Sequence, residues 1–258
     1  MKNLIILTTC IIAFGSSAVF AQNKHFTMNG TIEFEKTVNM FAFFEKQINK
    51  NNEDFLRSAF DSYKKTQPQF KKLKSTLTFA NNKTLFTPIE SDAPDNGFFG
   101  ESPVVNQVNT IADDLTTGLS INQKKVFEQN FLVKDTLRKI NWKITSETRE
   151  IAGFTCRRAN ALVMDSIYVV AFYADDIAVP GGPESFTGLP GMILGLALPH
   201  ENVTWFATKV NEVPVDDKAL MPPKKGKVVN NQQLTATLKN VMKDWGTYAN
   251  AYLKAFIL

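Results

Sequence analysis

The sequence contains few of the residues that build disulfides and metal sites: two cysteines and two histidines among 258 residues. Cys10 lies inside the apolar N-terminal run, so removal of that run leaves Cys156 alone and no internal disulfide can form. A zinc site needs three or four converging His, Cys, Asp or Glu ligands, and His25 and His200 are too few. We therefore predict no metal ion, and we expect core packing to stabilise the protein.

Motifs of common enzyme classes are also missing. Ser185 has neither the G-x-S-x-G spacing of a nucleophile elbow nor a nearby histidine. The glycines between residues 181 and 195 match neither the phosphate-binding loop nor the dinucleotide-binding spacing. We predict a protein that is not an enzyme and binds no cofactor, although an active site could still converge from residues distant in the sequence.

Charge is nearly balanced, with 29 Lys and Arg residues against 25 Asp and Glu residues. The charges are spread along the chain, which gives little support for binding to nucleic acid. Asp175 and Asp176 are adjacent, so an extended chain points their side chains to opposite faces. An acidic rim with Glu184, suited to a cation or an amine, would form only if the fold brought these three residues together.

The N-terminus has the features of a secretory signal peptide. Lys2 precedes an apolar run from Leu4 to Phe14, and small residues lead to Ala21. We expect cleavage after Ala21, so that residues 1–21 are the signal peptide and residues 22–258 form a single domain in the periplasm or outside the cell. A lipoprotein attached through Cys10 is a weaker alternative, and no run long enough to span a membrane remains after cleavage.

Hydrophobic periodicity predicts the secondary structure of residues 22–258. Residues 28–38 alternate as a strand with one buried face, and residues 40–63 have the spacing of two amphipathic helices or one broken helix. Asn81-Asn82 predicts a β-hairpin, residues 90–109 a loop, and residues 111–179 an antiparallel meander. A strand is predicted within residues 202–215, and one long amphipathic helix over residues 234–256.

These elements predict an α+β fold that is mainly antiparallel β. We expect a curved sheet or half-open barrel with helices packed on its concave side, like that of periplasmic lipoprotein carriers. That likeness concerns the fold alone and does not establish function.

The segment 182–196 combines four glycines and two prolines with an aliphatic run. Leu189-Pro190-Gly191-Met192 predicts a type II turn with Gly191 at positive φ, followed by a core strand. Gly195 within that strand indicates a bulge or the close approach of another backbone. We interpret the segment as a structural corner; the alternative is a loop that contacts a ligand or a partner.

Two stretches, "INWKITSETREIAGFTCRRANA" and "AFYADDIAVPGGPESFTGLPGMIL", resemble the GLPGLI family of secreted bacterial proteins. The matching corner residues are Pro180, Gly182, Pro183, Phe186, Gly188, Leu189, Pro190, Gly191, Met192 and Ile193, with Met192 in place of the family's Leu. The supporting positions are Trp142, Gly153, Cys156, Ala159 and Tyr173, and Phe172 stands where members usually carry Trp. The resemblance implies an envelope protein of a Gram-negative bacterium, and the family has no established activity.

Cys156 lies in a predicted strand beside Arg157 and Arg158. Those arginines could lower the pKa of the thiol, yet a small buried side chain is the preferred interpretation.

The chain is rich in aromatic residues, with 21 phenylalanines. This content, together with the missing catalytic motifs, predicts a non-catalytic binding or carrier module for an apolar ligand, a lipid chain or an extended peptide. The alternative is an accessory factor that binds an outer-membrane protein partner through residues 188–193 or through the C-terminal helix.

Overall fold

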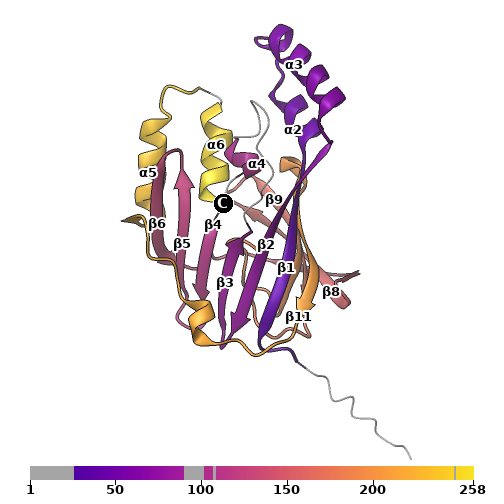
Figure 1. The fold of residues 1–258 in the computed structure, drawn as a ribbon, viewed down its shortest axis with the longest axis vertical. Helices are drawn as coiled ribbons and strands as arrows, with labels where there is room; N and C mark the ends of the chain where they lie inside the picture. The colour runs from indigo at the N-terminus through magenta and orange to yellow at the C-terminus, as the bar shows by residue number, and fades with distance from the viewer. Residues whose placement is uncertain (1–25, 90–101, 107–108, 247) are drawn as a thin grey trace, which may run out of the picture.

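A computed structural model describes residues 26–89, 102–106, 109–246 and 248–258 (Figure 1). The predicted signal peptide, His25 and residues 90–101 of the predicted loop lie outside the described residues. The rest of that loop prediction is wrong in part. Pro103–Asn106 forms the short helix α4, and Asn109 begins a strand.

Twelve strands form one sheet, in the order β12-β6-β5-β4-β3-β2-β1-β11-β10-β9-β8-β7. All neighbouring strands are antiparallel except β12 and β6. The strands are β1 (Gly30–Asn39), β2 (Phe70–Ala80), β3 (Lys83–Pro88), β4 (Asn109–Asp114), β5 (Leu119–Val126), β6 (Gln129–Thr136), β7 (Lys143–Ile151), β8 (Phe154–Val163), β9 (Ile167–Ala174), β10 (Met192–Leu198), β11 (Val203–Asn211) and β12 (Lys227–Val229). The α+β fold with a mainly antiparallel sheet is therefore confirmed.

The sheet consists of two meanders, β1–β6 and β7–β11, which are joined by the pairing of β1 with β11. Only residues 137–142 connect β6 to β7, so the ends of these strands can be at most about 25 Å apart. A flat sheet would separate β6 from β7 by ten strand spacings, or about 48 Å. The sheet must therefore curl, which places the two meanders over a shared core (Figure 1).

Period-2 alternation directs the core side chains inward, as the sequence predicted for the first strand. Ile32, Phe34 and Val38 of β1 are almost completely buried. The hairpin prediction is also confirmed, because Asn81 and Asn82 adopt φ angles of 50° and 56° between β2 and β3. Both residues tolerate the left-handed region that a tight hairpin turn requires.

Two helices, α2 (Met40–Gln47) and α3 (Glu53–Thr66), follow β1. The side chain of Asn39 caps α2 by accepting a hydrogen bond from the Ala42 backbone, and the Phe44 ring stacks on Phe60 at a centroid distance of 5.7 Å. Figure 1 shows this pair projecting beyond the end of the sheet. The expectation that these helices pack on the concave side is therefore wrong, because they bury their aromatic faces against each other.

The predicted long C-terminal helix is instead two helices, α5 (Asn231–Val241) and α6 (Tyr248–Ile257). Helix α5 ends at its C-cap Met242, and Gly246, with a φ of 59°, lies in the turn that leads into α6. The two helices pack on the same face of β5 and β6, in a cluster of Val126, Phe131, Val133, Val229, Leu234, Leu238, Met242 and Phe256. Among the described residues, no helix is both long and apolar enough to cross a membrane.

Candidate functional site

The corner predicted from the sequence lies in the connection between β9 and β10 and is folded into the core. Its backbone is fixed by hydrogen bonds from Gly188 N to Pro180 O (3.1 Å) and from Ile193 N to Gly181 O (2.9 Å). The Trp142 indole donates to the Thr187 carbonyl oxygen at 2.9 Å. Trp142 is 45 residues away from Thr187 in the sequence, yet the structure places it against the corner. Trp142 and the corner residues both belong to the GLPGLI-like pattern.

The predicted type II turn with Gly191 at positive φ is wrong. The positive φ belongs to Gly188, at 91°, and Gly191 is not among the residues with positive φ. A Cβ atom on Gly191 would lie 2.1 Å from the carbonyl oxygen of Ala174, which belongs to the neighbouring strand. Glycine is therefore required here because another backbone passes too close for a side chain.

Gly195 behaves as the sequence predicted. The register between β9 and β10 shifts between Ile193 and Gly195. A Cβ on Gly195 would also lie 2.7 Å from the ring of Phe206. Both features suit a glycine at an irregularity in a buried strand.

The other positions that match the GLPGLI pattern lie in a turn or in the core. Gly153 adopts a φ of 84° in the turn between β7 and β8. Ala159 and Tyr173 are fully buried. Burial raises the pKa of the Cys156 thiol to about 12, and the nearby carboxylates of Glu150, Asp175 and Asp176 add to this effect. At neutral pH the thiol is therefore protonated and unreactive, which favours the structural interpretation.

The acidic rim considered for Glu184, Asp175 and Asp176 does not form. Asp175 pairs with Arg157 at 3.7 Å and is partly exposed. Glu184 instead lies in the interior, where its carboxylate accepts a hydrogen bond from the side-chain amide of Asn109 at 2.8 Å. Its φ of 53° is uncommon for a residue other than glycine.

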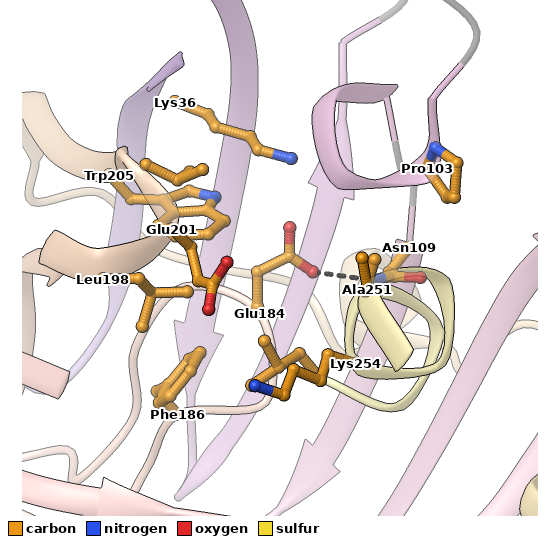
Figure 2. Close-up of a pocket in the computed structure, with 13 residues that line it drawn as sticks. Lys36, Pro103, Asn109, Glu184, Phe186, Leu198, Glu201, Trp205, Ala251 and Lys254 are labelled. Atoms are coloured by element: carbon orange, nitrogen blue, oxygen red, sulfur yellow. Dashed lines mark hydrogen bonds between the residues drawn. The ribbon is translucent and has the colours of Figure 1, made fainter. Parts of the chain in front are cut away.

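Glu184 borders a cavity of about 60 Å³ (Figure 2). The cavity lies between the inner face of the sheet at β1, β4, β10 and β11 and the inner side of α6. Its lining is Lys36, Pro103, Asn109, Glu184, Phe186, Leu198, Glu201, Val203, Trp205, Ala251, Lys254, Ala255 and Leu258. The walls are mostly apolar and include four charged side chains, those of Lys36, Glu184, Glu201 and Lys254.

Lys36 is the second buried charge at this cavity. Its ammonium donates to the Val105 carbonyl oxygen at 3.1 Å and lies 5.3 Å from the centre of the Trp205 ring. Burial lowers the pKa of Lys36, an effect that the carboxylate of Glu184 partly opposes. Burial likewise raises the pKa of Glu184, and Lys36 opposes that shift. No ion pair joins Lys36 directly to Glu184 among the described residues.

Two further cations hold the end of α6, and one of them, Lys124, also interacts electrostatically with Glu184. Lys124 donates to the Phe256 carbonyl oxygen at 2.7 Å, and Arg138 donates to the Ile257 carbonyl oxygen at 2.6 Å. Cations stabilise the C-terminal end of a helix, where carbonyl groups have no partner within the helix. These contacts fasten α6 over the cavity.

Lys36, Asn109 and Lys124 were not predicted as site residues from the sequence. Lys36 could have been found, because it continues the inward series of Ile32 and Phe34 at a period of two residues. A lysine at a buried strand position is unusual enough to mark a polar interior. The partners of Lys36 and the inward turn of Glu184 had no comparable signal in the sequence.

The site combines a hydrogen-bond donor and an acceptor inside an apolar pocket. No group of three or more His, Cys, Asp or Glu side chains in the described ranges is placed to hold a metal ion. His200 lies near the ring of Tyr168, and the hydroxyl of Ser185 donates to the Leu258 backbone oxygen at 2.6 Å. The arrangement is thus suited to holding a small polar group.

A family model described as "N-glycanase peptide, N-terminal domain" matches residues 72–237. The structures of PNGF-II in two crystal forms are similar to the structure of this chain. The C2 form matches with a TM-score of 0.52 and 15% identity, over 81% of this chain and 32% of the PNGF-II chain. The P21 form matches with a TM-score of 0.50 and 16% identity, over 81% and 33%.

This chain therefore spans about a third of the length of those PNGF-II chains. At such low identity the likeness concerns the fold alone. No curated protein has a significant sequence match to the chain.

Proposed function

Because the chain belongs to the N-glycanase N-terminal domain family, we propose that it is a non-catalytic module that binds an extended peptide through a group attached to it. The family description names an N-glycanase, so the ligand class that we propose is a peptide bearing an N-linked glycan. Enzymatic activity is not part of the proposal, since the chain matches only a third of PNGF-II and its pocket contains no paired nucleophile and base.

The observation that carries this proposal is the cavity beneath α6. It is largely apolar, yet it has the buried ammonium of Lys36 on one side and the buried carboxylate of Glu184 on another. Burying charged groups without a direct ion pair costs free energy, and such groups are a feature of binding sites.

The size of the cavity also distinguishes between the ligands predicted from the sequence, which were an apolar ligand, a lipid chain and an extended peptide. A lipid chain needs a long apolar cavity, whereas a volume of about 60 Å³ suits one small group of a larger molecule. We therefore favour the peptide over the lipid chain. The half-open, carrier-like arrangement is part of this proposal, with α6 covering one part of the curled sheet.

The cellular setting extends the proposal. The predicted signal peptide and the GLPGLI resemblance both favour export to the periplasm or out of the cell, where glycosylated peptides from outside would be encountered. Mass spectrometry of the protein recovered from the periplasm tests this part, because we expect a chain that begins at Gln22.

The binding proposal is tested by calorimetric titration of residues 22–258 with an N-glycopeptide and with the same peptide lacking its glycan. We expect the glycopeptide to bind and the bare peptide to bind at least tenfold more weakly. Mass spectrometry of the recovered glycopeptide should find it intact; a cleaved product would refute the non-catalytic assignment.

Two variants of α6 connect the binding to the cavity. Ala251→Phe places a ring in the cavity, and Asn250→Phe places the same ring at an exposed neighbouring position. We expect only Ala251→Phe to abolish binding. Equal binding by both variants would contradict this location for the site.

An accessory factor that binds a protein partner is the second candidate. Leu189 and Ile193 of the corner are buried, as are the apolar faces of α5 and α6, so this role would need a different surface. The projecting α2–α3 pair offers one, because Phe55 of α3 is 67% exposed. Crosslinking with a photoreactive residue at position 55 in periplasmic extract tests it, and no crosslinked partner would refute it.

A further inference from the structure

The Lys36 ammonium has hydrogen-bonding capacity directed at the cavity. An ammonium has three donors, and among the described residues one of them is used by the Val105 carbonyl oxygen. The Trp205 ring supports one side of the group, and Figure 2 shows the ammonium pointing into the space bounded by Glu184. A ligand in this space would therefore meet a fixed donor.

Glu184 supplies a fixed acceptor to the same space. A carboxylate has about four acceptor positions; the Asn109 amide occupies one, and the Trp205 indole N–H is a second donor beside it. The left-handed backbone at Glu184 and the contact with Asn109 hold the carboxylate in place. Figure 2 shows it between Lys36 and the α6 residues Ala251 and Lys254.

The remaining walls are mostly apolar, apart from the charged side chains of Glu201 and Lys254, and they leave room on the α6 side. Leu198 and Phe186 form one wall, and Ala251 and Ala255 expose only methyl groups on the other. These small side chains leave space where larger residues would fill the cavity. A ligand group with a small apolar end thus fits beside the donor and the acceptor.

The charged groups of the lining are balanced, with Lys36 and Lys254 against Glu184 and Glu201, so they favour no ligand of either net charge. An amine placed at Glu184 would face the ammonium of Lys36, and a carboxylate placed at Lys36 would face Glu184. A zwitterion would satisfy both groups but would lose the hydration of two full charges. A neutral group with one donor and one acceptor satisfies both without that loss.

We infer that this cavity binds a secondary amide that ends in a methyl group, such as an N-acetyl group. Its carbonyl oxygen accepts a hydrogen bond from Lys36, its N–H donates to Glu184, and its methyl packs toward Ala251 and Ala255. This inference rests on the proposed binding function and adds the chemistry of the group that is recognised. An N-acetylated sugar and a blocked peptide both carry this group.

Nuclear magnetic resonance titration of residues 22–258 with five small probes tests the inference. The probes are N-acetylglucosamine, glucosamine, glucose, N-acetylglycine N-methylamide and glycine. We expect at least one N-acetyl probe to bind at least tenfold more tightly than glucose, glucosamine and glycine. Binding of N-acetylglucosamine alone identifies a sugar as the source, and binding of the blocked peptide alone identifies a peptide; either result supports the inference.

The indole resonances of the three tryptophans locate the binding without any mutation. Trp205 lines the cavity, Trp142 is hydrogen-bonded to Thr187, and Trp245 is partly exposed at the surface. The N-acetyl probes should shift the Trp205 indole N–H signal, and the other two should remain in place. An unshifted Trp205 signal at saturating probe would overturn the inference.

Lys36→Met keeps the length of the side chain and removes the donor, so we expect it to weaken N-acetyl binding at least tenfold. Lys239→Met, at an exposed position of α5, is the matched control and should leave binding unchanged. Circular dichroism verifies that both variants fold. If glucose or glycine binds as tightly as the N-acetyl probes, the amide assignment is overturned. In that case the proposed function still stands if the glycopeptide binds. If the glycopeptide does not bind either, the amide assignment and the proposed function both fail.

Discussion

Gly191 offers the sharpest test of why the corner contains a glycine. A methyl group at this position would lie 2.1 Å from the Ala174 carbonyl oxygen and 2.8 Å from its carbonyl carbon. Both atoms belong to the backbone of β9, so no side chain can rotate away. An ordinary contact needs about 3.5 Å, and the strands would have to separate by more than about 1 Å where Met192 pairs with Ala174.

We therefore expect Gly191→Ala to cost about 3 kcal/mol, at the upper end of overpacking in a core. For a chain of this size, that corresponds to a fall in melting temperature of about 6–12 °C. Gly191→Asn should cost at least as much, since a larger side chain meets the same backbone. A turn that needs positive φ would give the opposite order, because Asn tolerates that conformation better than Ala.

Gly153 is the matched control for this prediction. Its φ is 84°, and an added Cβ would have no atom within 4 Å, so only the backbone conformation opposes a side chain. At Gly153 we expect Ala to cost about 1 kcal/mol and Asn to cost less. Urea unfolding of the four variants measures both orders. A Gly191→Asn variant that is more stable than Gly191→Ala would refute the close-approach argument.

Three further predictions concern buried side chains. Leu189→Ala should destabilise the protein by about 2–4 kcal/mol in urea unfolding, because Leu189 is 2% exposed within the main core. A cost under about 1 kcal/mol would mean that the corner repacks around the smaller side chain. Cys156 should react with a thiol reagent at neutral pH only after unfolding, since its pKa is raised to about 12; rapid labelling of the folded protein would contradict this. Burial raises the pKa of Asp113 to about 6, so its contribution to stability is present below about pH 4 and is lost as pH rises through about 6. Wild type should therefore lose up to about 3 kcal/mol across this range relative to Asp113→Asn, and parallel pH profiles of the two proteins would be the contrary result.

Local patterns predicted the elements that depend on neighbouring residues. The alternation around Ile32 and Phe34 predicts β1, and Asn81-Asn82 predicts the hairpin between β2 and β3, because period and turn chemistry act within a few residues. The break between α5 and α6 was missed, although Gly246 stands at that point. A continuous apolar stripe outweighed a single glycine in the prediction, whereas in the structure α5 ends at Met242 and the glycine lies in the turn before α6.

Features that depend on pairing between distant strands could not be predicted in this way. To predict why position 191 must be glycine, one has to know that Ala174 lies opposite Met192. That pairing is a property of the β9–β10 register. The curl of the sheet follows from the pairing of β1 with β11, whose residues are more than 160 positions apart in the sequence. The cavity depends on both, since its walls come from β1, β11, the corner and α6.

The interior cations have different physical explanations, and the difference favours Lys36 as a binding residue. Lys124 and Arg138 each donate to a carbonyl oxygen at the end of α6, so a structural task accounts for their burial. The Lys36 ammonium has only the Val105 carbonyl oxygen among the described residues and faces Glu184 without forming an ion pair. A Met at this position would pack as well and avoid the cost of burying a charge. The lysine at position 36 is therefore best explained by a polar ligand group that enters the cavity and accepts a hydrogen bond from its ammonium.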